Sequence, residues 1–289
     1  MNDFTVVICT YKRHNLIDIC LKNIFKNSIL PKKIIIVDQN YNYLSFQKII
    51  NIFKNQNYKN YLILRNLHQR GLTKSKNISI KHVKTKYVFF IDDDILLEKK
   101  YFYKTIKLIF AKKGDGVSGI ISNYPKNILK NYFYYLFNFN IFRDNRYFFI
   151  NYKKLNINQE YRVFQLPGGI TCYDMNVFKN ISFDEKYIIH NYEDVEFNIR
   201  LRKKLINPKL YLCINSLAYD KLSKNLKENF HSRLYYMTLL YLRNKSFKNL
   251  IFYVLSLIGF FASNLSVFKI TKINNMFSIL KLAILKSKN

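Results

Sequence analysis

Three consecutive aspartates, Asp92 to Asp94, directly follow the apolar run Tyr87–Ile91. Acids are scarce in this chain, which has 18 Asp and Glu against 48 Lys and Arg in 289 residues. Adjacent carboxylates repel each other and raise one another's pKa unless a cation neutralises them. Hard oxygen ligands suit Mg²⁺ or Mn²⁺, which proteins commonly hold with one or two carboxylates together with substrate phosphates. The triplet therefore predicts a divalent-cation and phosphate site, and a solvated acidic turn is the alternative.

A second acidic cluster contains Glu193, Asp194 and Glu196 and opens a stretch with a helical pattern. Acids in a first helical turn are ordinary partners of the helix dipole, and this explanation stays open. The functional alternative makes one of them a general base at the mouth of a site. The turn at Gly168 and Gly169 precedes this cluster and either lets the backbone approach a ligand closely or simply reverses the chain.

Strand-like and helix-like segments alternate through the first part of the chain. Strands are predicted at 4–9, 33–37, 61–64 and 87–91, and helices near 16–25, 47–53, 73–83 and 101–112. Continuous apolar strands separated by helices are typical of a parallel sheet that is covered on both faces. Ligands of such sheets bind beyond the carboxyl ends of the strands. Thr10, Asp38 and Asp92 each fall at such an end, so we expect them to line one crevice.

The composition narrows the choice of partners. The formal net charge of +30 suggests anionic lipid, polyphosphate or nucleic acid. The basic residues are spread along the chain without a single basic block, which favours a membrane or an anionic substrate over nucleic acid. The four cysteines show no zinc-ligand spacing and are expected to be reduced thiols, and no signal peptide is apparent. These features predict a cytoplasmic catalytic region.

The C-terminal region differs in kind from the rest. The twenty residues from Asn249 to Phe268 carry no charge, which is long enough to span a bilayer. Basic residues flank both sides, and both flanks would prefer the cytoplasmic side. We therefore expect a membrane-surface or re-entrant segment, continued by an apolar face with Phe277, Leu280 and Ile284. A single span and a dimer interface are the alternatives, so a homo-oligomer stays open. The expected division is a catalytic domain over 1–220 and a helical, membrane-associating region over 221–289.

Taken in order, six short segments resemble family 2 glycosyltransferases of the GT-A fold, and the resemblance covers roughly residues 4 to 205. It is closest to bacterial enzymes that build lipopolysaccharide, capsule or glycan side chains. The segments are Thr10–Arg13, Val37-Asp38, Arg70-Gly71 with Lys76-Asn77, Asp92–Asp94, Pro167–Gly169, and Glu193-Asp194 with Arg200. The resemblance implies an α/β fold with a mainly parallel sheet flanked by helices, and a C-terminal hydrophobic helical appendage.

The resemblance also implies a role for each matching residue on the donor side. Thr10, Tyr11 and Arg13 would hold the base and diphosphate of a nucleotide sugar, and Asp38 would contact the base. Lys76 would contact phosphate, although lysine loses the bidentate fork of the family's usual arginine. Asp92 to Asp94 match the D-x-D motif. Within it, Asp92 would face the ribose, Asp93 would belong to the donor site, and Asp94, with Asp92, would hold Mg²⁺ or Mn²⁺.

On the acceptor side, Gly168 and Gly169 match the turn under the donor sugar and acceptor. Glu193 would contact the acceptor, and Asp194 would be the catalytic base. The implied reaction is an inverting transfer of one sugar from a UDP or dTDP sugar to a saccharide or lipid-linked acceptor. It would take place on the inner face of the cell membrane. The processive Q-x-x-R-W signature is absent after Glu193-Asp194, which favours addition of a single sugar.

Two other function classes stay in view. A sugar-nucleotidyltransferase would need a Gly-rich loop after the first strand, and Thr10–Arg13 contains no glycine. A basic nucleic-acid or membrane-binding protein without catalytic activity leaves both acidic clusters unexplained. Specificity is expected in the insertion Ser122–Gln165, which is rich in Tyr, Phe, Asn and Lys and is a candidate acceptor lid.

Overall fold

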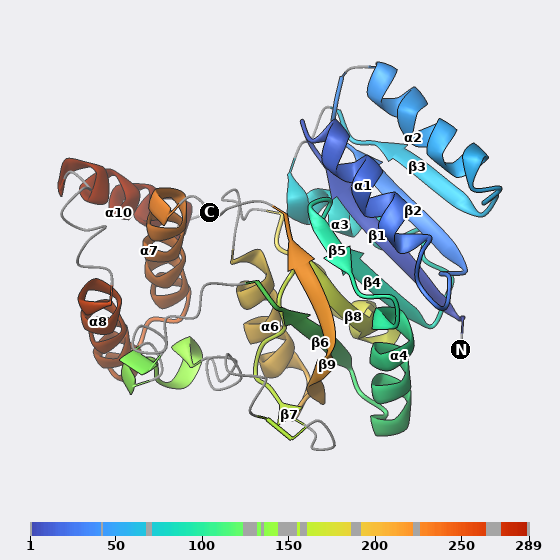
Figure 1. Cartoon of the computed structure of the whole chain (residues 1–289). Helices are drawn as coiled ribbons and strands as arrows, with labels where there is room; N and C mark the ends of the chain where they lie inside the picture. The colour runs from blue at the N-terminus through green and yellow to red at the C-terminus, as the bar shows by residue number, and fades with distance from the viewer. Residues whose placement is uncertain are drawn as a thin grey trace.

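A computed structural model of the chain shows a central sheet with helices on both faces, next to a separate group of C-terminal helices (Figure 1). The residues that the structure describes are 2–41, 43–67, 71–123, 132–133, 136–143, 155–156, 161–185, 192–221, 226–263 and 273–287. Most of the predicted insertion Ser122–Gln165 therefore lies outside them, and so does Arg70.

The N-terminal half follows the predicted alternation of strands and helices. Its strands pair in parallel in the order β3-β2-β1-β4, with Thr10 of β1 opposite Asp38 of β2. The predicted strands and helices are confirmed, although the helix expected over 73–83 ends at Ile80. The elements are β1 (Phe4–Thr10), α1 (His14–Ile24), β2 (Lys33–Asp38), α2 (Tyr43–Asn55), β3 (Tyr61–Arg65), α3 (Leu72–Ile80), β4 (Tyr87–Ile91) and α4 (Tyr101–Lys112).

The strands β1, β2 and β4 are mainly apolar because both of their faces are buried, whereas β3 is only partly buried. In β1, Phe4, Val6 and Ile8 point to one side and pack with residues of α1, α2 and α4. Val7 points to the other side, where the apolar residues of helix α6 (Glu193–Lys204) pack. Side chains of a strand alternate between faces, so a strand covered on both sides needs no polar positions.

The second half of the sheet mixes strand directions. β8 pairs antiparallel with β4 and with β6, whereas β6 and β9 run in parallel and β5 and β7 pair antiparallel with β9. The fold is therefore mixed α/β, and its expected parallel part is the N-terminal half. The remaining strands are β5 (Ile95–Leu97), β6 (Gly116–Ile121), β7 (Tyr161–Arg162), β8 (Ile170–Asp174) and β9 (Leu210–Asp220). Short 3-10 helices occupy Asn140–Phe142 and Met175–Lys179.

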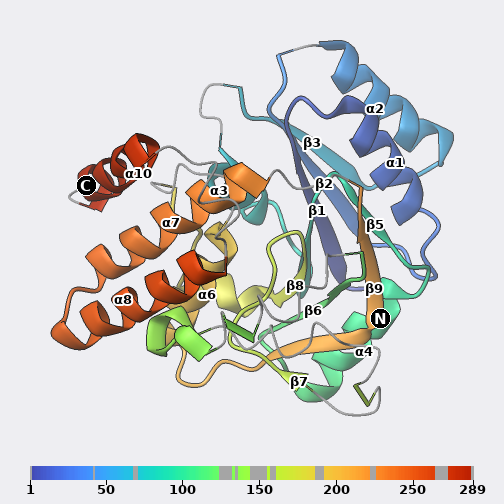
Figure 2. The same cartoon turned by 60° about the vertical axis from the view of Figure 1, so that its left-hand side comes forward.

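Three C-terminal helices share an apolar core of their own. α7 (Leu226–Arg243), α8 (Phe247–Ala262) and α10 (Ile273–Ser287) lie on the α6 side of the sheet, as the turned view shows (Figure 2). Leu234, Phe260 and Ala283 are buried between them, together with Val195 and Ile199 of α6. None of the helices in the described part of the chain has the length and apolarity needed to cross a membrane.

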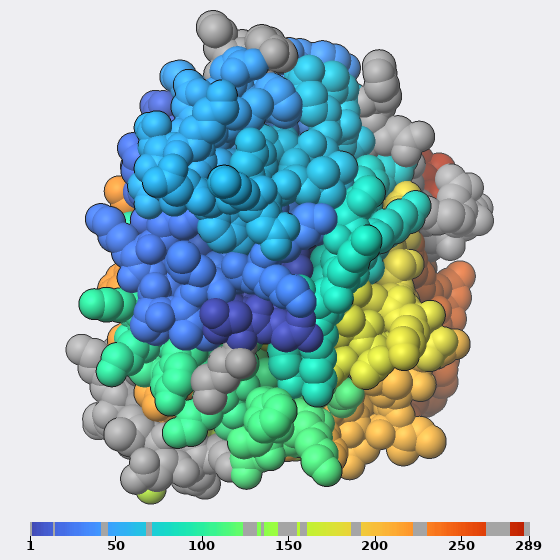
Figure 3. Space-filling view, turned by 90° about the vertical axis from the view of Figure 1, so that its right-hand side faces the viewer, coloured from blue at the N-terminus to red at the C-terminus, as the bar shows by residue number. Residues whose placement is uncertain are grey.

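From the opposite side, the surface is made mainly of the first hundred residues (Figure 3). Blue and cyan atoms of the N-terminal half cover most of this face, and the segment after β8 borders it in yellow. The C-terminal helices lie behind. The two parts of the chain thus form opposite sides of the molecule, with the carboxyl ends of the parallel strands and the start of α6 between them.

Candidate functional site

The carboxyl ends of β1, β2 and β4 lie side by side, as expected. Thr10 pairs with Asp38 across β1 and β2, and β4 lies on the other side of β1 and leads directly into the acidic triplet. The Thr10 hydroxyl donates a hydrogen bond of 2.6 Å to Asp93 Oδ2. Tyr11 follows at the same edge, with the Lys12 ammonium 5.3 Å from the centre of its ring.

Arg13 holds two of the three aspartates. Its Nη1 atom lies 3.1 Å from Asp93 Oδ1 and 3.0 Å from Asp94 Oδ2. Burial raises the pKa of Asp93, and the Thr10 hydrogen bond and the Arg13 charge oppose that rise. Burial also raises the pKa of Asp94, with Arg13 opposing it and the Asp220 and Asp93 charges adding to it. Arg13 thus lies beside two carboxylates whose ionised forms are both disfavoured by burial.

Asp220 is a site residue that sequence reasoning missed. It ends β9 and pairs with Ile95, directly after Asp94, and the next backbone amide, Lys221 N, donates to Asp94 O at 3.0 Å. A single acid at the end of a strand gives little signal, because the pairing of β9 with β5 joins residues more than a hundred positions apart. The structure places a fourth carboxylate within electrostatic reach of Asp94.

Asp38 is fully buried, and only one of its two carboxylate oxygens accepts hydrogen bonds from the described residues. Its Oδ1 atom accepts hydrogen bonds from Asn40 N at 3.0 Å and from Asn40 Nδ2 at 2.5 Å. Its Oδ2 atom is also buried and has no hydrogen-bond partner among the described residues. A buried oxygen without a partner costs free energy, so each such atom needs an explanation. A ligand N–H group would supply one.

The backbone around Asn40 is shaped for this arrangement. Asn40 Oδ1 accepts a 2.6 Å hydrogen bond from Lys12 N, and Lys12 adopts a positive φ of 56°. The neighbouring Gln39 accepts a 2.8 Å bond from Gly71 N at the start of α3. Gly71 has φ 152°, a conformation that favours glycine. Residues in sparsely populated backbone regions cluster at functional sites, because the surrounding structure must hold them there.

Lys76 lies in α3 but does not point to solvent. Its ammonium is buried 3.0 Å from Glu193 Oε1, and the carbonyl of Gly168 is at 3.5 Å. Burial disfavours the charged amine, but the Glu193 and Asp92 carboxylates together outweigh it and raise the pKa of Lys76 to about 12. The residue expected at a phosphate thus pairs with the residue expected at the acceptor.

The Gly168-Gly169 turn joins the two acidic clusters. Asp92 N donates to Gly169 O at 2.9 Å, and a Cβ atom on Gly169 would overlap the Asp92 carboxylate. A Cβ atom on Gly168 would lie 2.9 Å from Glu193 Oε1 and 3.2 Å from Asp194 Cβ. Any larger residue at either position would push these acids away. The turn is therefore glycine because acidic side chains pack directly against its backbone.

Asp194 stands in the first turn of α6, partly exposed beside this turn. The residue that caps the helix, Tyr192, has a positive φ of 70°, and Asn198 Nδ2 donates to Asp194 O at 2.7 Å. A partly exposed carboxylate at the edge of a crevice can accept a proton from a bound hydroxyl group. The structure thus places the predicted site residues at the ends of β1, β2 and β4, in α3, in the Gly168-Gly169 turn and at the start of α6, whereas Arg200 lies further along α6 and pairs with Glu196.

The acidic triplet also fits a divalent cation by its chemistry. Its donors are all carboxylate oxygens, which suit Mg²⁺ or Mn²⁺. Within the described residues no group of three or more His, Cys, Asp and Glu is placed to hold a metal by itself. A cation here would therefore take one or two ligands from Asp92 and Asp94 and the others from a bound phosphate group and water.

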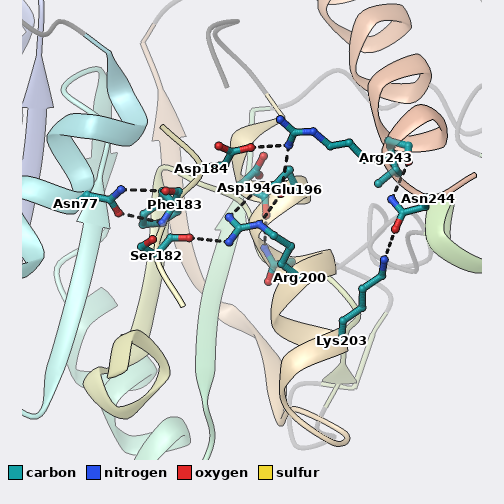
Figure 4. A network of polar contacts seen from close by, with 12 residues as sticks. Asn77, Ser182, Phe183, Asp184, Asp194, Glu196, Arg200, Lys203, Arg243 and Asn244 are labelled. Carbon is teal, nitrogen blue, oxygen red and sulfur yellow. Dashed lines mark hydrogen bonds and ion pairs between the residues drawn. The ribbon is translucent and has the colours of Figure 1, made fainter. Parts of the chain in front are cut away.

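A network of charged residues connects α6 to the end of α7 (Figure 4). Arg243 Nη1 lies 2.5 Å from Asp184 Oδ2 and 3.9 Å from Glu196 Oε1, and Glu196 also pairs with Arg200. These residues line a cavity of about 520 Å³ beside α6. Because Glu196 is two residues from Asp194, the network ties the C-terminal helices to the helix that carries Asp194.

Comparison with known protein families identifies one matching family. The sequence model described as Glycosyl transferase family 2 matches residues 5–181, which is more than half of the chain. A comparison with curated protein sequences finds no match.

Several solved structures share the fold. A mannosyltransferase from Pyrobaculum calidifontis, PcManGT, in complex with GDP-Man and Mn²⁺ aligns with a TM-score of 0.63 at 12% identity, covering 98% of this chain and 80% of that one. S. aureus TarS 1-349 in complex with UDP-GlcNAc aligns with a TM-score of 0.62 at 15% identity, covering 98% and 81%. A longer TarS chain aligns at 0.56 and 17% identity, and this chain covers only 40% of it.

Proposed function

The chain belongs to glycosyl transferase family 2, and we propose that it transfers one sugar, with inversion, from a nucleotide-diphosphate sugar to a saccharide or lipid-linked acceptor. One observation carries the proposal. The Gly168-Gly169 turn packs against Asp92 on one side and against Glu193 and Asp194 on the other. A donor phosphate held at the first cluster and an acceptor hydroxyl at the second would then meet at the turn.

The base of the donor follows from the chemistry of Asp38. Its buried Oδ2 atom can only accept a hydrogen bond while the carboxyl is ionised. Uracil, thymine and guanine carry a ring N–H group that donates, whereas cytosine and adenine donate only through an exocyclic amino group and present an accepting ring nitrogen beside it. This favours UDP, dTDP or GDP donors. Two similar structures contain UDP-GlcNAc and GDP-Man, and the resemblance described above points to UDP or dTDP.

We propose that Asp94, with Asp92, holds Mg²⁺ or Mn²⁺. A divalent cation bound there would neutralise the diphosphate as it leaves, as metal ions do in phosphate chemistry. Burial is the main reason why the pKa values of Asp93 and Asp94 are raised, and a divalent cation bound beside them would favour their ionised forms. Thr10 and Arg13 keep the triplet in place.

Asp194 would act as the base. It takes the proton of the acceptor hydroxyl, whose oxygen forms a bond to the anomeric carbon as the bond to the diphosphate oxygen breaks on the opposite face. The products are the glycoside and the nucleoside diphosphate. Glu193 is committed to its ion pair with Lys76, so its part would be to orient the first turn of α6 and the acceptor beside it.

The resemblance to bacterial family 2 glycosyltransferases also suggests a biological role. We propose a role in bacterial cell-surface glycan synthesis at the inner face of the membrane, with residues 1–220 as the catalytic domain and 221–289 as the membrane-associating region. One observation supports a boundary near residue 220: the sheet ends at Asp220, and the last three helices pack against one another and against α6 without adding to the sheet.

The experiment is a donor-turnover assay with Mn²⁺ that measures release of the nucleoside diphosphate from a panel of UDP, dTDP and GDP sugars. Wild type should turn over one donor class, and Asp194→Asn should lose about 10²- to 10⁴-fold in turnover while still binding the donor. Asp18→Asn, which changes a partly exposed acid on α1 that forms an ion pair with Lys22, is the matched control. Full activity of Asp194→Asn would remove Asp194 from the mechanism.

A further inference from the structure

Helix α8 carries an apolar stripe that the fold leaves open to solvent. Five large residues on one side of this helix are between 38% and 80% exposed. Their spacing of three or four residues places them along one side of a helix. We call them the α8 stripe: Phe247, Leu250, Ile251, Val254 and Ile258.

The other side of α8 is firmly packed. Ser256 and Phe260 are 1% exposed, and the Tyr253 hydroxyl lies 2.8 Å from Thr238 Oγ1 of α7. A Cβ atom on Gly259 would overlap the side chain of Phe137. The helix is therefore fixed by its inner side, and the exposure of the stripe is a property of the folded molecule.

From residue 229 onward, the charged residues of the chain are all basic. Residues 229–289 contain no Asp or Glu and nine Lys and Arg. Lys245 and Lys248 are exposed at the start of α8, next to the first residues of the stripe. Apolar residues beside lysines, without acids, match the chemistry of an anionic lipid surface. A second copy of this chain would instead bring two strongly basic regions together.

The dimensions of α8 agree with a surface position. A helix of 16 residues is about 24 Å long, which is shorter than the roughly 30 Å hydrocarbon core of a bilayer.

We propose that α8 lies in the plane of an anionic bilayer, with the α8 stripe among the acyl chains and Lys245 and Lys248 at the lipid headgroups. This docking site rests on the proposed membrane association of residues 221–289, but it does not depend on the proposed reaction. It assigns the membrane contact to one face of one helix, anchored to α7 by Thr238 and Tyr253. The charge network of Arg243 then fixes the position of α6 relative to the bilayer.

Vesicle flotation of the full-length protein tests this directly. Wild type is mixed with equimolar phosphatidylcholine and phosphatidylglycerol vesicles, or with pure phosphatidylcholine vesicles. The variant Ile251→Gln/Val254→Gln changes two residues of the stripe. Phe110→Gln/Ile206→Gln is the matched control, because it changes two large residues that are 69% and 102% exposed on α4 and after α6. Phe247→Gln, at the most exposed position of the stripe, gives a second and milder change.

Wild type and the control should float with the anionic vesicles, and the stripe variant should lose about tenfold or more of its partition coefficient. Lys245→Gln/Lys248→Gln should reduce both the binding and its sensitivity to salt. Thermal unfolding of each variant checks that the fold is intact. The proposal is overturned if wild type stays in solution, if it floats equally with pure phosphatidylcholine, or if the stripe variants float like wild type. Self-association of wild type that the stripe variants abolish, without flotation, would assign the stripe to a dimer instead.

Discussion

Lys76 Nζ and Glu193 Oε1 form a buried ion pair at 3.0 Å, although the two residues lie 117 positions apart in the chain. The pair joins α3, which starts at the Gln39–Gly71 contact, to the first turn of α6, where Asp194 stands. This charged contact therefore connects the proposed donor side to the proposed base side, close to the carbonyl of Gly168.

Removing one partner of this ion pair should strongly destabilise the fold. Lys76→Met leaves the Glu193 carboxylate buried without its partner, and we expect the free energy of unfolding to fall by about 3–5 kcal/mol in urea titrations. Lys22→Met is the matched control, because the Lys22–Asp18 pair is solvent-exposed, with side-chain exposures of 58% and 37%, and should contribute at most about 1 kcal/mol. An equal decrease in the free energy of unfolding of the two variants would show that the buried ion pair stabilises the fold no more than an exposed one.

The same pair predicts a dependence on alkaline pH. The pKa of Lys76 is raised from 10.5 to about 12, so the folded state holds this proton more tightly than the unfolded state does. The stabilisation is fully present below pH 10.5 and is lost as pH rises through about 12. The stability difference between wild type and Lys76→Met should therefore shrink by about 2 kcal/mol across this range. Tyrosine ionisation affects both proteins alike, and a constant difference would contradict the assignment.

Gly169→Ala should damage donor binding more than it damages the fold. The new Cβ atom would overlap the Asp92 carboxylate, which can move aside at a cost of about 1–3 kcal/mol. We expect nucleotide binding with Mn²⁺, measured by calorimetry, to weaken about tenfold or more. The double variant Gly169→Ala/Asp92→Ala should regain stability but not binding. Gly114→Ala, whose new atom would meet Tyr211 at 3.2 Å, should leave binding unchanged.

Asp38→Asn should change the preference for the nucleotide base. The amide keeps one acceptor for Asn40 but can place a donor where the buried Oδ2 atom now stands. Binding of UDP, dTDP or GDP should weaken about tenfold or more, whereas CDP should lose less or gain. Competition binding with these nucleotides measures the change, and Asp18→Asn serves as the control. An unchanged order of affinities would place the base elsewhere.

The positions of the donor-side residues followed from the sequence for a physical reason. β1, β2 and β4 are buried on both faces, so they stand out as continuous apolar runs, and their ends mark Thr10, Asp38 and Asp92. Parallel strands share one carboxyl edge, which made the crevice predictable. The start of α6 was also clear, because Glu193 and Asp194 precede a regular helical pattern.

What escaped the sequence depends on pairing between distant segments. The strands β6, β8 and β9 pair with strands that are distant in the sequence, some in parallel and some antiparallel. No local sequence pattern therefore reveals that β9 ends with Asp220 near Asp94. The partner of Lys76 was missed for the same reason. In both cases a charged residue gains its role from a neighbour that only the folded chain supplies.

The central claim is that the Asp92–Asp94 triplet binds a nucleoside diphosphate through a divalent cation. Calorimetry with UDP, GDP, dTDP and CMP in the presence of Mn²⁺, on wild type and on Asp94→Ala, tests it most directly. We predict that one nucleoside diphosphate binds only with the metal and that Asp94→Ala loses this binding while remaining folded. Binding of no nucleotide by the folded wild type, or equal binding by Asp94→Ala, would contradict the account and leave the triplet with a structural role.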